Sequence, residues 1–170
     1  MSFINSILKV FVGDKSQKDV KALQGNITKV KSFETALAAL SNDELRAKTQ
    51  YFKDKIKQAR SEKDNKIEAL KLEVEQIEDI DKREDIYATI DSLEKEAYEI
   101  SEKTLNEILP EAFAVVKETA RRFKENTTIR VKATPRDREF SATKSYVELE
   151  GDDAIWANTW NAAGKQITWD

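Results

Sequence analysis

The sequence of 170 residues contains no cysteine and no histidine. It therefore has no disulfide scaffold, no thiolate or imidazole ligands for zinc, no Cys-x-x-Cys redox pair and no nucleophile paired with histidine. A chain without cysteine also fits a reducing, cytosolic environment. Only four glycines and two prolines are present, so turns are few and long helices are favoured.

Phosphate-binding loops are absent as well. A P-loop requires the pattern G-x-x-x-x-G-K followed by Ser or Thr, because its backbone N–H groups must be free to hold phosphate. The closest match is Gly164-Lys165, but Gln166 stands in place of the hydroxyl residue and Thr159 in place of the first glycine. We interpret this stretch as a hairpin turn. The isolated chain is expected to have no catalytic residue, no bound cofactor and no metal site.

Long apolar runs are missing too. No segment approaches the roughly 20 apolar residues that span a bilayer, and the start has neither a cationic leader nor a small-residue cleavage site, so we expect a protein that is neither exported nor integral to a membrane. A net charge of −3 argues against nucleic acid as a partner. The charges are separated by segment: residues 1–33 hold six lysines and two aspartates, whereas residues 60–104 hold eight cationic and fifteen anionic side chains.

The spacing of apolar residues predicts a mainly α-helical fold with a small antiparallel β part: amino-terminal helices, a long antiparallel helical hairpin, and a C-terminal small sheet with one short helix. One helix is expected from about Asp19 to Leu40, with an apolar stripe of Val20, Leu23, Ile27, Val30, Phe33, Leu37 and Leu40. Ser41 and Glu44 form an S-x-x-E capping box, so a new helix should begin there. Its buried side should contain Leu45, Phe52, Ile56 and Ala59.

Residues 60–103 consist almost entirely of Lys, Glu, Asp and aliphatic residues. Their apolar positions are spaced like the seam of a coiled coil, first at Ile67, Leu70, Val74 and Ile77 and then at Ile86, Ile90, Leu93, Ala97 and Ile100. We expect two antiparallel helices joined near residues 79–84, where the spacing slips. One continuous helix with a stutter is the alternative.

A last helix is predicted over Leu105–Phe123, interrupted by Pro110, with a buried side made of Ala112, Phe113, Val116, Ala120 and Phe123. Beyond it, alternation predicts strands at residues 129–133, 140–142 and 146–149. A short helix capped by Asp152 or Asp153 is expected to hold Trp156 and Trp160 and to end at Gly164, before another strand at residues 167–169. The two tryptophans could stack on a base or a peptide, although packing within the protein is the simpler interpretation.

The first eleven residues form a short amphipathic pattern. An apolar stripe lies opposite polar residues and is followed by scattered lysines. Such a helix can lie in the headgroup layer of an acidic membrane or on a channel partner. The candidate contact residues are Phe3, Ile4, Ile7, Leu8, Lys9 and Phe11. A docking helix in the protein's own core is the alternative, and the sequence favours neither.

Three stretches together resemble the SecA preprotein translocase ATPases of bacteria. They are Leu8-Lys9-Val10-Phe11 with the lysine-rich helix that follows, LSNDELRAKTQYFKDKI at residues 40–56, and LPEAFAVVKETARR at residues 109–122. In that family the last motif leads into a segment whose Gln reads adenine and then into a G-E-G-K-T phosphate loop. Neither follows here, so the resemblance is to an amino-terminal fragment that lacks both.

The resemblance covers residues 1–57 and 104–123. It divides the chain into amino-terminal amphipathic and scaffold helices (1–57), an inserted helical hairpin (58–103), a helix leading into the motor lobe (104–123) and a small β-rich extension (124–170) that we expect to be truncated.

The resemblance implies the front end of an ATP-driven motor that moves secretory preproteins through the Sec channel. This piece would act as scaffold and as membrane- or channel-contact segment, with the Sec channel, acidic phospholipid and the remainder of the motor as partners, and a homodimer is allowed. ATP and magnesium would serve the full-length protein, which would be cytoplasmic and cycle to the inner face of the membrane. The alternative is a stand-alone helical adaptor that binds a protein partner through its coiled-coil-like hairpin.

Overall fold

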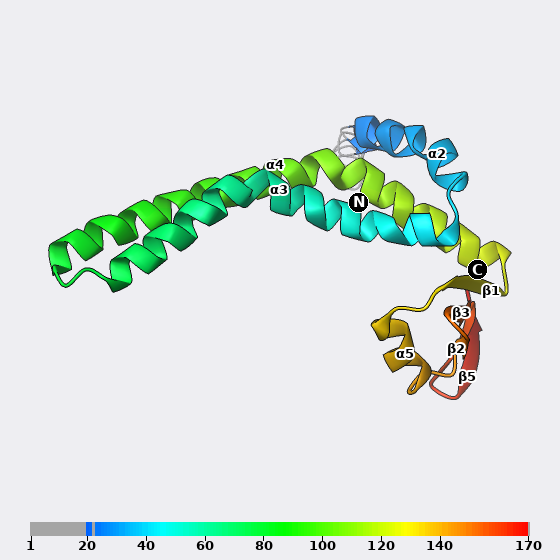
Figure 1. The fold of residues 1–170 in the computed structure, drawn as a ribbon. Coiled ribbons are helices and arrows are strands. Elements are labelled where there is room, and N and C mark those ends of the chain that lie inside the picture. Colours follow the sequence, from blue (N-terminus) through cyan, green and yellow to red (C-terminus); the bar gives the residue numbers. More distant parts are fainter. Residues whose placement is uncertain (1–19, 22, 170) are drawn as a thin grey trace, which may run out of the picture. The chain divides into compact units, whose positions relative to one another are not determined.

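The computed structural model describes residues 20, 21 and 23–169 (Figure 1). They fall into two compact units, of which one combines the described residues up to Leu45 with Phe113–Trp169 and the other is Arg46–Ala112. Residues 23–32 are helical. The elements that follow are α2 (Glu34–Ala38), α3 (Asn42–Glu75), α4 (Ile80–Glu125), β1 (Thr128–Lys132), α5 (Pro135–Ser141), β2 (Val147–Glu150), β3 (Asp153–Ala157), β4 (Thr159–Ala162) and β5 (Lys165–Thr168). The predicted fold class, mainly helical with small antiparallel sheets and one short helix, is confirmed.

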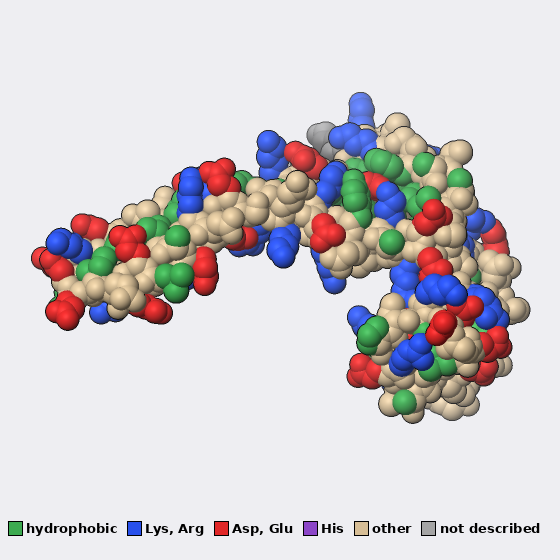
Figure 2. All heavy atoms as spheres, in the orientation of Figure 1, with side chains coloured by type: hydrophobic (Ala, Val, Ile, Leu, Met, Phe, Trp, Pro, Cys, Tyr) green, Lys and Arg blue, Asp and Glu red, His purple; other side chains and the backbone are tan. Residues whose placement is uncertain are grey.

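The unit of Arg46–Ala112 is a helical hairpin made by α3 and α4. Ion pairs join Lys48 to Glu111 at 2.8 Å and Lys63 to Glu96 at 2.5 Å, so a step forward along α3 matches a step back along α4 and the helices are antiparallel. The predicted seam lies between them, with four side chains at most 6% exposed: Ile67, Val74, Ile90 and Ala97. Side chains of both charges are distributed along the face of the hairpin seen in Figure 2. The alternative of one continuous helix is wrong.

The turn of this hairpin comes earlier than predicted. α3 ends at Glu75 and α4 begins at Ile80, so the joint is residues 76–79 and not 79–84. The side chain of Asp79 accepts hydrogen bonds from the backbone N–H groups of Asp81 and Lys82, at 3.1 and 3.3 Å. It therefore acts as the N-terminal cap of α4. The surrounding run of acidic residues offers several possible caps, and the spacing alone did not single this one out.

Pro110 lies inside α4 and does not interrupt it. Proline has no N–H, so the carbonyl of Asn106 loses its helical partner, at a cost of about 3 kcal/mol. Pro110 is buried, as is Ile108 beside it, and this packing keeps the helix intact. One helix of 46 residues therefore replaces the two helices predicted on either side of residue 104.

Several side chains predicted to be buried are exposed. On α4, Phe113 is 59% and Val116 67% exposed, whereas Ala114 and Val115 are buried. The prediction failed because the buried face of α4 also carries a glutamate and an arginine, which an amphipathic pattern assigns to solvent. On α3, Ala59 is exposed as well.

The helix predicted over residues 19–40 is broken near Phe33, where residues 23–32 end and α2 begins. Of its predicted stripe only Leu37 is buried. Val20, Leu23 and Ile27 are between 42% and 57% exposed. Among the described residues, no helix is both long enough and apolar enough to cross a membrane.

The β part of the first unit is a three-stranded antiparallel sheet in the order β1-β3-β2. Its small core contains Ile129, Val131 and Ala154, with Phe123, Ala133 and Trp156 packed against them. On the opposite face, Arg130 and Lys132 of β1 form ion pairs with Asp153 of β3 at 3.2 and 2.7 Å. The alternation predicted for residues 129–133 is thus confirmed, as is the strand before the turn at Gly151.

Two predicted elements of this region are wrong. Residues 140–142 do not form a strand, because the helix α5, capped by Thr134 and begun by Pro135, runs through Ser141. Trp156 and Trp160 do not share a helix but lie on β3 and β4. A run of three alternating residues, or a spacing of four between two aromatic residues, is too short to separate helical from strand periodicity. Pairing with neighbouring strands decided the secondary structure at Trp156 and Trp160.

The β4–β5 hairpin is closed by two residues with positive φ, Ala163 at 50° and Gly164 at 76°. Two consecutive left-handed residues are typical of a type I′ turn. The turn predicted at Gly164-Lys165 is therefore present. Ala163 is strained, because a left-handed conformation costs a residue with a Cβ roughly 1–2 kcal/mol.

Replacing Ala163 with Asn should relieve this strain and stabilise the hairpin by about 1 kcal/mol. The measurement is urea unfolding followed by tryptophan fluorescence, since Trp160 and Trp169 lie in or beside the hairpin. Ala162→Asn, at an exposed strand position, is the control and should bring no gain. Equal unfolding midpoints for Ala163→Asn and the unchanged chain would show that the turn stores no strain.

Candidate functional site

The unit that contains the sheet is organised around the buried side chain of Arg122, near the end of α4. Its Nη2 donates to the carbonyl oxygens of Leu37 at 3.1 Å and Leu40 at 2.7 Å, which places a positive charge at the C-terminal end of α2. Its Nη1 donates to Oδ1 of Asn42 at 2.8 Å. One guanidinium therefore ties α4 to the end of α2 and to the start of α3. We call this set of contacts the Arg122 junction.

Glu118, one turn earlier on α4, balances the charge of Arg122. Arg122 Nε donates to Glu118 Oε1 at 2.8 Å. Arg121 donates hydrogen bonds to both carboxylate oxygens of Glu118, at 2.7 and 2.8 Å. The side chain of Glu118 is only 8% exposed. Hydrogen bonds from Arg121 and then Arg122 lower the pKa of Glu118 to about 2, against the desolvation that would raise it. The carboxylate is therefore ionised throughout the physiological range.

The first residues of α3 cover the open edge of the sheet. β1 pairs only with β3 in its sheet, so the backbone groups on its other side need different partners. Asn42 Nδ2 donates to the carbonyl of Arg130 at 3.1 Å, and the N–H of Lys132 donates to Oδ1 of Asp43 at 2.8 Å. Asn42 thus connects Arg122 to the sheet.

The predicted capping box sets the position of these side chains. The backbone N–H of Ser41 donates to Oε2 of Glu44 at 2.7 Å, and the backbone N–H of Glu44 donates to Oγ of Ser41 at 3.2 Å. Hydrogen bonds from the backbone N–H of Ser41 and then from its hydroxyl, which donates to Oε2 of Glu44 at 2.7 Å, lower the pKa of Glu44. The prediction of a helix start at Ser41 is confirmed, and the first turn that it begins contains Asn42 and Asp43.

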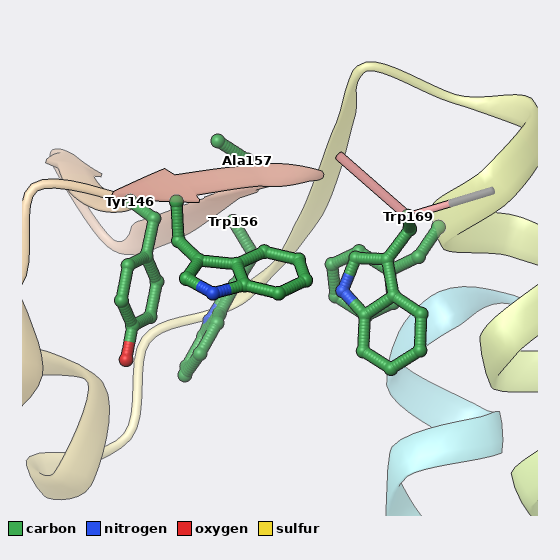
Figure 3. Close-up of a pocket in the computed structure, with 6 residues that line it drawn as sticks. Tyr146, Trp156, Ala157 and Trp169 are labelled. Atoms are coloured by element: carbon green, nitrogen blue, oxygen red, sulfur yellow. The ribbon is translucent and has the colours of Figure 1, made fainter. Parts of the chain in front are cut away.

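An aromatic pocket of about 350 Å³ lies in the same unit (Figure 3). It is lined by Phe123, Tyr146, Trp156, Ala157, Trp160 and Trp169. The rings form two groups. Trp156 packs against Tyr146 and Phe140, with centroid distances of 6.2 and 5.8 Å. Trp169 packs against Phe123 and Trp160, at 6.2 and 5.8 Å. Figure 3 shows Tyr146 and Trp169 at opposite ends of the pocket.

A buried carboxylate holds one wall of this pocket. Asp137 is 0% exposed and accepts a hydrogen bond from the indole Nε1 of Trp156 at 3.1 Å. It also accepts from the backbone N–H and the hydroxyl of Thr134, both at 2.7 Å, in the capping box of α5. The start of α5 and the indole of Trp156 are therefore held by the same side chain.

The contact residues predicted from the sequence, Phe3, Ile4, Ile7, Leu8, Lys9 and Phe11, lie outside the described residues. Within the described ranges, no group of three or more Asp, Glu, His or Cys side chains could hold a metal ion. Arg122 and Asn42 were not among the site residues predicted from the sequence. The available signal was the spacing of four between Glu118 and Arg122, which suits a helical ion pair.

Comparison with known proteins assigns the chain to a family. The family profile for the SecA DEAD-like domain matches residues 8–134, about three quarters of the chain. This chain belongs to the SecA family. The protein translocase subunit SecA of Flavobacterium psychrophilum is 75% identical over 170 residues, which is 100% of this chain and 15% of that protein. The SecA subunits of Christiangramia forsetii and Bacteroides fragilis are 59% and 45% identical over 100% and 97% of the chain, again 15% of each relative.

The chain thus spans about 15% of the length of the curated SecA relatives it matches. The alignments with the two most identical of these run through residues 58–103 and 124–170, so both segments have counterparts in SecA proteins. No solved structure matches the chain.

Glu118 should make the stability of this SecA chain depend on pH. Its folded pKa, about 2, lies below the ordinary value of 4.5. Its contribution is therefore complete above pH 4.5 and is lost as the pH falls toward 2. Replacing Glu118 with Gln should lower the free energy of unfolding at neutral pH, by at most about 3 kcal/mol, and should flatten the loss of stability in acid.

Urea midpoints measured by circular dichroism across that pH window test this expectation. The matched control is Glu125→Gln, because Glu125 also contacts Arg121 but is 54% exposed. A pH dependence that is equally steep with and without the Glu118 carboxylate would assign the effect to other groups.

Proposed function

We propose that the chain is the amino-terminal part of an ATP-driven motor that moves secretory preproteins through the Sec channel, and that it serves this motor as scaffold and as membrane- or channel-contact segment. The observation that carries the proposal is the 75% identity, over the whole chain, to a protein translocase subunit SecA. The partners would be the Sec channel, acidic phospholipid and the remainder of the motor. The full-length protein would be cytoplasmic and cycle to the inner face of the membrane.

The Arg122 junction supports the scaffold role. The guanidinium of Arg122 is engaged by acceptors on three elements, since it donates to groups on α2, α3 and α4. Among the described residues, no buried side-chain nitrogen or oxygen lacks a hydrogen-bond partner. The junction therefore has the properties of a structural connection, without a spare acid, base or nucleophile for catalysis.

The helix of residues 23–32 supports the contact role. It exposes the apolar side chains of Leu23 and Ile27, at 56% and 42%. Lys29 and Lys31 on the same helix are exposed as well. An apolar stripe next to lysines suits a surface that carries acidic headgroups.

The adaptor hypothesis has less support. A partner that bound along the coiled-coil-like seam would need its apolar residues to be accessible. Ile67, Val74 and Ile90 are at most 6% exposed, because α3 and α4 bury them against each other.

The isolated chain is expected to hydrolyse no ATP above a buffer blank, because it contains no phosphate loop. ATP and magnesium would be bound by other parts of the full-length protein. The measurement is phosphate release by the purified chain, with the protein from the complete reading frame as positive control. A natural stop codon directly after Asp170, or turnover by the isolated chain, would contradict the proposed division of labour.

Deletion of Met1–Phe11 should weaken co-sedimentation with vesicles of phosphatidylglycerol, since the deletion removes the apolar stripe. The helical circular dichroism signal should change little, because the hairpin of Arg46–Ala112 has its own buried seam. Zwitterionic phosphatidylcholine vesicles provide the control. Undiminished binding to the anionic vesicles would remove the lipid from the list of partners.

A further inference from the structure

We propose that the aromatic pocket is a binding site for an extended, uncharged polypeptide segment, which inserts a bulky apolar side chain between the two groups of rings. The main-chain carbonyls of the same segment accept hydrogen bonds from donors at the pocket wall. This activity goes beyond the scaffold and contact roles, and it requires neither ATP nor the Sec channel.

The composition of the wall selects a neutral, apolar ligand. Five of the six lining residues are aromatic, the sixth is Ala157, and none carries a charge. A phosphate or an acidic headgroup would find no cation in the lining to compensate its charge. The volume of about 350 Å³ lies near the lower end of the roughly 300–1,000 Å³ typical of ligand pockets. This volume suits one or two side chains better than a large cofactor.

Three of the four polar side-chain groups in the wall are donors without an acceptor in the protein, since only the indole N–H of Trp156 donates to Asp137. Within the described part of the chain, neither the indole N–H groups of Trp160 and Trp169 nor the hydroxyl of Tyr146 has a hydrogen-bond partner. No buried side-chain nitrogen or oxygen of the described residues lacks a partner, so the groups of Tyr146 and Trp160 are open to solvent and to the acceptors of a ligand. An extended polypeptide presents carbonyl acceptors at a rise of about 3.3 Å per residue. Grooves lined by aromatic residues hold extended, proline-rich segments in several recognition domains.

The two walls differ in a way that allows a side chain to enter. Trp156 is held by its hydrogen bond to the fully buried Asp137 and by the edge of Phe140. Trp169 is 46% exposed and is held by ring contacts with Phe123 and Trp160. One wall is therefore preorganised and the other can adjust to the ligand.

The β4–β5 hairpin beside the pocket offers a place for the rest of the segment. All four residues of β5 are exposed, and among the described strands β5 pairs with β4 alone. Its other edge consequently has free backbone donors and acceptors. An extended chain can follow this edge while its side chain occupies the pocket.

The test uses the 170-residue chain and a short fluorescein-labelled peptide of Gly and Ser with a central Leu-Pro-Leu. Fluorescence anisotropy should show saturable binding to the unchanged chain. Trp169→Ala should weaken binding at least about tenfold by removing one wall. Trp169→Phe keeps a ring and removes the N–H, so it should weaken binding about threefold, the effect of one neutral hydrogen bond. Circular dichroism establishes that each variant is folded.

The matched control is Phe113→Ala, since Phe113 is a 59% exposed aromatic residue of the same unit that does not line the pocket. It should leave binding unchanged. Equal affinity of the Trp169→Ala variant and the unchanged chain would overturn the proposal, as would equal binding of a peptide in which Ser-Gly-Ser replaces Leu-Pro-Leu. Displacement of the peptide by phosphatidylglycerol vesicles would assign the pocket to lipid and would likewise overturn it. Because nucleotide, membrane and channel are absent from the main titration, failure of the proposed motor role would not produce any of these results.

Discussion

A guanidinium that is removed from water must find acceptors for its N–H groups, because an unpaired buried charge costs several kcal/mol. Arg122 finds them on three separate segments: Glu118 on α4, Asn42 on α3, and two carbonyls at the end of α2 and just beyond it. These acceptors can be reached together only if the three segments meet at one place. Asn42 extends the constraint to the sheet, since its amide nitrogen donates to a carbonyl of β1. The arrangement of this unit therefore follows from the need to provide hydrogen-bond acceptors for the guanidinium of Arg122. A lysine could not replace it, because an ammonium group lacks the planar fork that reaches carboxylate, amide and carbonyls at once.

The same residues explain the motif on which the family resemblance rests. LPEAFAVVKETARR at residues 109–122 contains both Glu118 and Arg122, and these charged residues are buried at 8% and 9% exposure. The motif is therefore more than a helical surface with a hydrophobic stripe. It carries the ion pair that joins α4 to its neighbours, which is consistent with the scaffold role proposed for this part of a SecA protein.

The aromatic pocket depends on a second buried polar group, the carboxyl group of Asp137. Asp137 is needed twice, as the partner of Thr134 in the capping box of α5 and as the acceptor for the indole of Trp156. Its burial links the start of a short helix to the wall of a pocket formed by distant residues of the chain. The function proposed for the pocket thus rests on the same principle as the Arg122 junction, in which a buried polar group orders several elements around it.

Local patterns were sufficient for much of the fold. The capping box at Ser41 and Glu44, the seam from Ile67 to Ile100 and the alternation of β1 each involve residues close in sequence, and each was predicted from the sequence. Caps and periodicities are properties of neighbouring residues, so they are visible without a structure. Where the local signal was short, as at residues 140–142 and around Trp156 and Trp160, the predictions failed.

The sequence by itself determined the helical class of this protein, its antiparallel hairpin and its membership of the SecA family. The reason is that periodicity, caps and motifs each involve residues close together in the sequence. Only the tertiary structure decided that Glu118 and Arg122 are buried, that Pro110 stays within a helix, and that five aromatic residues from different elements and loops line one pocket. The physical reason is that burial of a charge and pairing of strands depend on partners far away in the sequence. Arg122 and Asn42 are 80 residues apart.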